Sequence, residues 1–448
     1  MQNDNFNSSN TQQPLSPYQQ PYNMPPPRKR SVLMRVLLAA TAVIVALGIG
    51  VGVAYYMDQS KGAKPAAQDT VASQTFYYRD GKTVLDDAPA FKAHVLDQLQ
   101  AKYGGSRLKQ GEWSITTTLD PALQKTAKDQ VQTAKAALTQ RRTASATFMA
   151  QDVSNGQILS WVNGWDETAS SGPLSNKKTE WGMLMLPVVY GAYFDSGKGT
   201  ADTMLDDTRG VLPGWPCNNV ALPAQGGNCL YNYDQKFLGP LSAKQALGGM
   251  RLVPAVKAAV AIKDTSSSPD FTHIVQAAKT LGGDGKCYED QQLTTEASCS
   301  GAAVLGDGLF AQRNSMLHAY ATLANEGKKL PQAVWLQVTH DGKAIDKWQQ
   351  PKSEQAIKAA AANNVRTILA DSTVSYLGKQ SDLFVLPGNK AISTVAGLEM
   401  SGTQAAALQF TQRYVAALWV TADGSAFAGA IETSALAVTH GWLAGADK

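Results

Sequence analysis

The sequence predicts an α+β fold that is preceded by a single transmembrane helix. The strand signal is clearest in residues 144–163, where two apolar-rich runs flank Asn155-Gly156, the strongest short turn signal for a β-hairpin. The helix signal is clearest in residues 121–140, which begin with proline and follow Asp120, a residue suited to the N-cap. Mixed strand and helix signals of this kind agree with an α+β architecture.

The membrane helix is predicted from residues 36–56, a run of about 21 residues without a charge, long enough to cross the hydrocarbon core. We expect the helix to occupy residues 31–57, behind a polar, disordered tail of residues 1–30. The basic cluster lies before the run, so the positive-inside rule predicts a cytoplasmic N-terminus and an extracytoplasmic C-terminal domain at the cell membrane. A cleaved signal peptide is the alternative, although its apolar region is usually shorter.

Charge and motif content exclude several classes of partner. The net charge of the 448 residues is +4, and about three of these charges precede residue 36, so the outer portion is nearly neutral. Such a surface gives no reason to expect nucleic acid as a partner. The sequence contains no glycine-rich phosphate-binding loop and no zinc-ligand spacing. We therefore expect no cofactor and no metal.

Four cysteines form two pairs of equal spacing. Cys217 and Cys229 are separated by the same interval as Cys287 and Cys299. In an extracytoplasmic domain this pattern favours two local disulfides. A metal site is the less favoured alternative, because neither pair has the C-x-x-C spacing.

Several segments resemble the transpeptidase domain of penicillin-binding proteins. Residues 116–124 are similar to the strand-to-helix entry of these domains, and residues 151–164 are similar to their first hairpin. Residues 179–197 resemble the helix that carries the catalytic serine and lysine, with Gly182 and Pro187 in their family places. The resemblance implies a transpeptidase/β-lactamase-like antiparallel sheet of about five strands with helices on both faces. We assign this domain to residues 113–448.

The family's nucleophile and its lysine are both replaced. Met183 stands at the position of the serine and Leu186 at the position of the lysine. Acyl transfer in this family needs a serine hydroxyl that a lysine on the next turn deprotonates. A thioether and an isobutyl group can do neither, so both residues are interpreted as packing residues.

The second family motif, S-x-N, is also apolar. The block at residues 238–256 is similar to the segment that carries this motif, and Met250 and Leu252 stand where the serine and asparagine belong. The resemblance gives those two polar residues the roles of relaying protons and positioning substrate. Neither replacement can perform them.

The third motif, K-[TS]-G-T, is partly kept. Met400 replaces the lysine, whereas Ser401, Gly402 and Thr403 remain and form a candidate ligand-binding segment. The resemblance places the backbone N–H groups of Met183 and Thr403 in the family's oxyanion hole. We expect the remaining backbone to present hydrogen bonds to an extended stem peptide by strand addition.

Ser175 and Lys178 satisfy the spacing S-x-x-K but precede the apolar helix instead of starting it. They are a fallback catalytic pair, because a polar loop does not hold a serine and a lysine in register. Residues 58–112, a linker and small pedestal, are too short for the glycosyltransferase domain that class A penicillin-binding proteins carry. We therefore expect no polymerising activity from this chain.

The sequence thus predicts a membrane-anchored penicillin-binding-protein homologue related to peptidoglycan cross-linking. The leading hypothesis is a catalytically inactive pseudo-transpeptidase that binds peptidoglycan, a stem peptide or cell-wall synthesis proteins. One alternative is an active serine D,D-transpeptidase or carboxypeptidase that uses Ser175 with Lys178, or Ser401. Another is a receptor for an apolar ligand, which requires a cavity bounded by Met183, Met250 and Met400.

Overall fold

The computed structural model describes residues 72–165, 178–217, 229–263, 271–289, 292–294, 301–378, 380–399 and 402–447. The predicted transmembrane helix, residues 31–57, lies outside this part of the chain. Within the described ranges, no helix combines the length and apolar character that crossing a bilayer requires.

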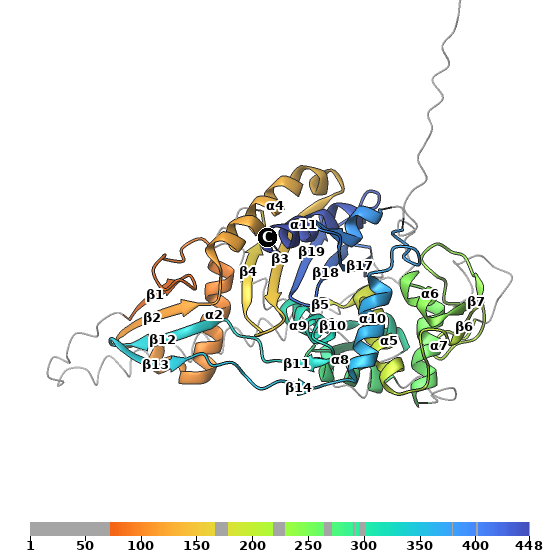
Figure 1. The fold of residues 1–448 in the computed structure, drawn as a ribbon, viewed down its shortest axis with the longest axis horizontal. Coiled ribbons are helices and arrows are strands. Elements are labelled where there is room, and N and C mark those ends of the chain that lie inside the picture. Colours follow the sequence, from red (N-terminus) through yellow and green to blue (C-terminus); the bar gives the residue numbers. More distant parts are fainter. Residues whose placement is uncertain are drawn as a thin grey trace, which may run out of the picture.

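A five-stranded antiparallel sheet in the order β17-β18-β19-β3-β4 forms the centre of the fold (Figure 1). Every neighbouring pair is antiparallel. This sheet confirms the predicted hairpin of residues 144–163 and the expected antiparallel architecture. Its strands are β3 (Thr143–Asp152), β4 (Ile158–Asn163), β17 (Ser393–Leu398), β18 (Gln404–Phe410) and β19 (Tyr414–Ala422).

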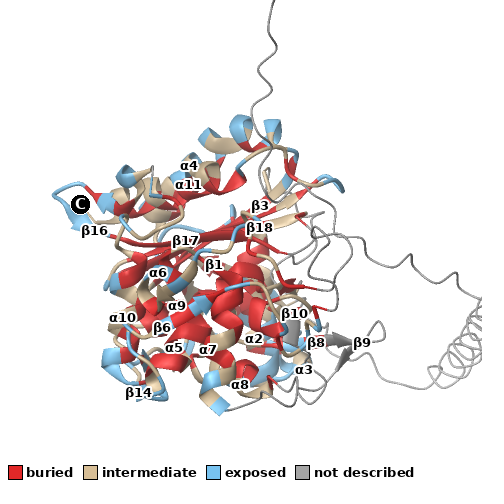
Figure 2. Ribbon diagram, turned by 90° about the vertical axis from the view of Figure 1, so that its right-hand side faces the viewer, coloured by how far each residue is buried: buried red, intermediate tan, exposed pale blue. Residues whose placement is uncertain are grey.

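Helices cover both faces of the central sheet. On one face, α4 (Pro121–Gln140) packs against α11 (Ile431–Ala446), and both contact sheet strands. On the other face, α9 (Arg313–Ala324) lies against β3 and β19. Figure 2 shows buried residues concentrated in the sheet and in the helices beneath it. The helix α4 matches the predicted segment, and the Asp120 carboxylate caps it by accepting from the N–H groups of Ala122 and Leu123.

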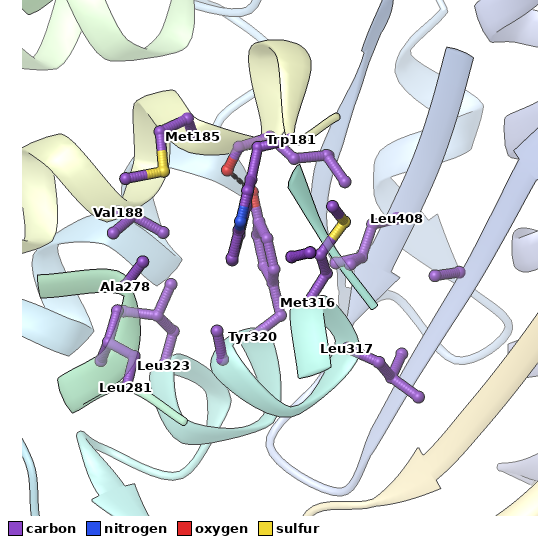
Figure 3. Close-up of a cluster of buried hydrophobic side chains, with 14 of the residues drawn as sticks. Trp181, Met185, Val188, Ala278, Leu281, Met316, Leu317, Tyr320, Leu323 and Leu408 are labelled. Atoms are coloured by element: carbon purple, nitrogen blue, oxygen red, sulfur yellow. Dashed lines mark hydrogen bonds between the residues drawn. The ribbon is translucent and has the colours of Figure 1, made fainter. Parts of the chain in front are cut away.

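A helical lobe lies beside α9 and contains the segment of the first family motif. In its core, the Tyr320 hydroxyl donates to the Leu184 carbonyl at 2.7 Å, and Trp181, Met185 and Met316 pack around it (Figure 3). The lobe contains α5 (Met185–Asp195), α6 (Ala243–Gly248), α7 (Leu252–Lys263), α8 (Thr272–Thr280) and α10 (Ala359–Leu369).

Short strands complete the lobe. Strand β6 (Met204–Asp207) pairs with β7 (Gly239–Ser242), and β11 (Lys328–Lys329) pairs with β14 (Glu354–Gln355). A further sheet has the order β5-β10-β8-β9, formed by β5 (Thr179–Glu180), β10 (Leu309–Ala311), β8 (Lys286–Glu289) and β9 (Gln292–Thr294).

The pedestal contains a separate four-stranded sheet with the order β1-β2-β12-β13. It combines β1 (Ser73–Tyr77) and β2 (Glu112–Thr117) with β12 (Trp335–His340) and β13 (Lys343–Lys347). The sequence predicts an amphipathic helix over residues 89–103, and α2 (Pro89–Tyr103) confirms it; the short α3 (Gly105–Leu108) follows. Strands from distant parts of the chain therefore build the pedestal together, as the left side of Figure 1 shows.

One predicted helix starts later than expected. The alanine-rich composition of residues 353–370 predicts a helix over that range, but α10 begins at Ala359. Residues 354–355 pair with β11 instead, and the Lys358 N–H donates to the Asp195 carboxylate at 2.7 Å. These contacts hold the preceding segment in an extended conformation.

The cysteine prediction is confirmed for the first pair, because a disulfide joins Cys217 and Cys229. Cys287 is also disulfide-bonded. Cys299, its predicted partner, lies outside the described residues.

Candidate functional site

The first family motif forms a 3-10 turn, η3 (Gly182–Leu184), that leads into α5. Gly182 has a φ of +52°, which glycine adopts without strain. A Cβ at this position would lie 2.9 Å from the Leu398 carbonyl oxygen, and the Gly182 N–H donates to the Gly306 carbonyl at 3.2 Å. The turn is therefore clamped between the end of β17 and the residues before β10.

Met183 fills the space beside β17. Its side chain is 5% exposed, and a Cβ added to Gly397 would lie 2.6 Å from the Met183 Cβ and 2.8 Å from its sulfur. The next family position, Leu186, is 0% exposed. Both replacements pack in the hydrophobic core, so apolar side chains occupy the place where the resemblance puts the catalytic pair.

The second motif surrounds a buried ion-pair network. Met250 is fully buried with a φ of +48°, and Leu252 begins α7. Between them, Arg251 pairs with Asp207 and Asp234, each at 2.9 Å. Two apolar residues at the motif positions thus flank a buried arginine whose charge is balanced by Asp207 and Asp234.

Asn232 completes this network. Its side-chain oxygen accepts from the N–H groups of Leu252 and Val253 at 2.9 and 3.2 Å, so it caps α7. Its amide nitrogen donates to Asp207 at 2.6 Å. Sequence reasoning did not identify Asp207, Asn232 or Arg251. The signal that was present is a charged residue inside an otherwise apolar block.

The third motif forms the turn between β17 and β18. Met400 and Ser401 lie outside the described residues. Glu399, directly before them, is buried, and its Oε1 accepts from the Thr403 N–H at 2.7 Å, from the Thr403 hydroxyl at 3.0 Å and from the Gln404 N–H at 2.9 Å. The Gly402 N–H donates to the Glu399 carbonyl at 3.1 Å. The resemblance assigns the Thr403 N–H to the oxyanion hole, but in this chain that N–H donates to the Glu399 carboxylate.

Three carboxyl groups cluster around this turn. Burial, together with the charges of Asp307 and Glu399, raises the pKa of Glu180 to about 8. Burial and the charge of Glu399 also raise the pKa of Asp307. Glu180 is hydrogen-bonded to the Glu399 side chain. At neutral pH a protonated Glu180 can share its proton with the Glu399 carboxylate, which joins β5 to the β17–β18 turn.

The cavity at this place is very small. It has a volume of about 10 Å³, room for about one water molecule, and Glu180, Gly397 and Glu399 line it. None of the described residues that line it is serine, cysteine or lysine. The structure therefore leaves no space for a peptide at this cavity and provides none of the family's nucleophilic groups there.

Arg313 is buried against the same cavity. Its Nη1 donates to the Thr147 hydroxyl at 2.6 Å, and burial lowers its pKa to about 10. Its Nε has no hydrogen-bond partner among the described residues, and the same holds for Nε1 of Trp419. A single water in the cavity could satisfy such groups.

The fallback pair is not assembled within the described residues. Ser175 lies outside them, and Lys178 is partly buried directly before β5. In the part of the chain that the structure covers, no group of three or more His, Cys, Asp or Glu side chains is arranged to hold a metal ion.

Comparison with known proteins shows which sequences and folds the chain resembles. No protein-family model matches the chain. Penicillin-binding protein 1A/1B of Bacillus subtilis (strain 168) is 24% identical over 348 residues, which cover 77% of this chain. The match covers 33% of that relative, so the chain spans about a third of its length.

Solved penicillin-binding proteins have a similar fold. PonA1 from Mycobacterium tuberculosis matches with a TM-score of 0.66 and 18% identity, covering 81% of this chain and 93% of that one. Penicillin-binding protein 1A from Haemophilus influenzae matches with a TM-score of 0.62 and 14% identity, covering 82% and 71%. PonA1 has also been solved in complex with penicillin V. The chain therefore has the transpeptidase-type fold of penicillin-binding proteins, as the resemblance predicted.

Proposed function

We propose that this chain is a membrane-anchored, catalytically inactive relative of penicillin-binding proteins that binds or organises peptidoglycan, a stem peptide or cell-wall synthesis proteins. The observation that carries the proposal is the packing of Met183, which the resemblance places at the position of the family nucleophile, against Gly397. Its relation to peptidoglycan proteins rests on the shared fold and on the similarity to penicillin-binding protein 1A/1B.

The chemistry of the motif positions supports inactivity. Acyl transfer needs a nucleophile, a base and hydrogen-bond donors for the developing oxyanion. Met183 and Leu186 supply no nucleophile and no base. The Thr403 N–H already donates to the Glu399 carboxylate. The negative charge of this carboxylate would repel an oxyanion. The described residues at these positions therefore supply neither the nucleophile nor the base, and one of the two expected oxyanion donors is already occupied.

Stem-peptide binding at the Ser401–Thr403 segment remains part of the proposal, with a condition. All six residues of β17 are buried, and the N–H groups of Gly402 and Thr403 donate within the turn. A peptide can use these N–H groups only after Glu399 releases them. Strand addition here therefore requires opening of the turn, whereas binding at another surface does not.

Co-sedimentation tests the proposed binding. The full chain in detergent is mixed with purified peptidoglycan. The pellet is washed, digested with a muramidase to release any attached muropeptide, denatured and weighed by intact-protein mass spectrometry. We expect saturable sedimentation with an unchanged protein mass. Failure of the folded chain to sediment removes peptidoglycan as the partner. A mass gain that matches a covalent acyl group supports the displaced-residue alternative, in which Ser175 with Lys178, or Ser401, acts as the nucleophilic site.

A further inference from the structure

An open cavity lies at the opposite end of β17 from the small cavity beside Glu399. Its volume is about 670 Å³, within the range typical of small-molecule sites. Ser393, the first residue of β17, lines it, together with residues of α10 and of the turn between β18 and β19. Strand β16 (Lys390–Ala391) and the C-terminal end of α11 close another side, and Figure 2 shows these two segments side by side.

The charges in this cavity are unequal. Three cationic side chains line it, Arg366, Lys390 and Arg413, against two acidic ones, Asp371 and Asp447. Both acids already have a lysine partner. Asp447 pairs with Lys390 at 2.7 Å, and Asp371 pairs with Lys244 at the same distance. The two arginines therefore hold the unbalanced positive charge.

Neither arginine has a carboxylate partner among the described residues. Arg366 Nη2 donates to the Asn363 side-chain oxygen at 3.2 Å, while its Nε is buried without a hydrogen-bond acceptor in the described part of the chain. The Arg413 guanidinium lies over the Tyr414 ring, with 4.8 Å to the ring centroid. A stacked guanidinium is oriented by the ring and keeps its N–H groups available for an oxyanion.

We propose that this cavity binds a small ligand that carries a carboxylate or phosphate group, with Arg366 and Arg413 as the anion-binding residues. Planar guanidinium groups match both oxyanions through paired N–H donors. Ala370 and Ala391 add apolar surface to the lining, which suits a ligand with a nonpolar part beside its anionic group. The site is independent of the proposed peptidoglycan function and of the family's catalytic cleft.

Isothermal titration of the full chain in detergent at low ionic strength, with malonate and inorganic phosphate as separate probes, tests the site. We expect one saturable site for at least one probe. Arg366→Gln and Arg413→Gln should each raise the Kd about tenfold, because each removes a charge-assisted hydrogen bond. Lys347→Gln, an exposed cation on β13, is the matched control and should leave the Kd unchanged. Tighter binding of malonate identifies a carboxylate ligand, and tighter binding of phosphate identifies a phosphorylated one.

Two results overturn the proposal. One is no saturable heat for either probe with protein whose circular dichroism and melting temperature show that it is folded. The other is a Kd that both arginine substitutions leave unchanged, or that Lys347→Gln raises equally, since this indicates attraction to general surface charge. Because Arg413 is exposed, Arg413→Gln should fold normally and keeps the test valid if Arg366→Gln does not.

Discussion

The two ends of β17 differ in what the chain has placed beside them. At the Leu398 end, η3 and Met183 pack against the strand, and the remaining cavity of about 10 Å³ holds no more than about one water. At the Ser393 end, a cavity of about 670 Å³ is lined by two arginines that have no acidic partner in the part of the chain that the structure covers. The end where the resemblance expects chemistry is closed, whereas the opposite end is open and positively charged.

The difference teaches that one strand can be tightly packed at one end and border an open, charged cavity at the other. The overall fold is that of solved penicillin-binding proteins. At the Leu398 end, Met183 and Leu186 belong to the hydrophobic core, and the Glu399 carboxylate accepts from the N–H groups of Thr403 and Gln404. Closed packing at one end and unpaired charge at the other lead to different responses to substitution.

The largest effect is expected for the buried network beside the second motif. Asp207→Ala removes a partner of the buried Arg251 and should destabilise the fold by about 3 to 5 kcal/mol. Lys125→Ala breaks an exposed pair with Asp129 and should change stability by less than about 1 kcal/mol. Urea unfolding of both variants measures the difference. Equal effects would show that the buried network contributes no more to stability than an exposed ion pair.

A smaller loss is expected where Met183 meets β17. Gly397→Ala adds a methyl group 2.6 Å from the Met183 Cβ, and overpacking of this kind should cost about 1 to 3 kcal/mol. Gly210→Ala is the matched control, because nothing lies within 4 Å of its added Cβ. If thermal unfolding shows the same midpoint for Gly397→Ala as for wild type, the contact that closes the cleft is looser than described.

The carboxyl cluster predicts a dependence on pH. Folded Glu180 keeps its proton up to about pH 8, whereas the ordinary value of its pKa is 4.5. Between these pH values the folded state binds more protons than the unfolded state, so the free energy of unfolding falls as pH rises and levels off above about pH 8. Burial lowers the pKa values of His94 and His318, and their effect is confined to pH below about 6.5.

Glu180→Gln sharpens this prediction, because the amide resembles the protonated carboxyl and does not titrate. Melting temperatures between pH 7 and 8.5 should decline less steeply for Glu180→Gln than for wild type. Identical slopes for the two proteins would mean that Glu180 does not carry a raised pKa in the folded chain.

The smallest effect on stability is expected at the open end. Arg413→Ala removes an exposed side chain that stacks on Tyr414 but has no ion pair among the described residues, so the free energy of unfolding should change by at most about 1 kcal/mol. Urea unfolding of Arg413→Ala and Gly397→Ala compares the two ends directly. Equal losses of stability would show that the two ends of β17 do not differ in this way.

Local signals explain which parts of the fold could be predicted from the sequence. Helices α2 and α4 begin with proline, and the Asn155-Gly156 turn fixed the hairpin of β3 and β4. Helix starts and tight turns depend on residues that are adjacent in the sequence, so the sequence alone indicates them. The burial of Met183 and Leu186 was predictable for a similar reason, since an apolar helix implies a core position.

The polar contacts of the site could not be predicted in the same way. Arg251 meets Asp207 across 44 positions, Glu180 meets Glu399 across more than 200, and Arg313 meets Thr147 across 166. No local pattern relates such residues. Likewise, the cavity with Arg366 and Arg413 forms only when α10 and the β18–β19 turn come together in the fold.

Covalent labelling tests the central claim most directly. The full chain, confirmed to be folded, is incubated with a fluorescent penicillin and run on a denaturing gel beside its Ser175→Ala and Ser401→Ala variants. The packing of Met183 and Leu186 in the core predicts no covalent label on any of the three proteins. A stoichiometric label on the wild-type chain that one serine variant loses would contradict this account and assign the acylation chemistry to that serine.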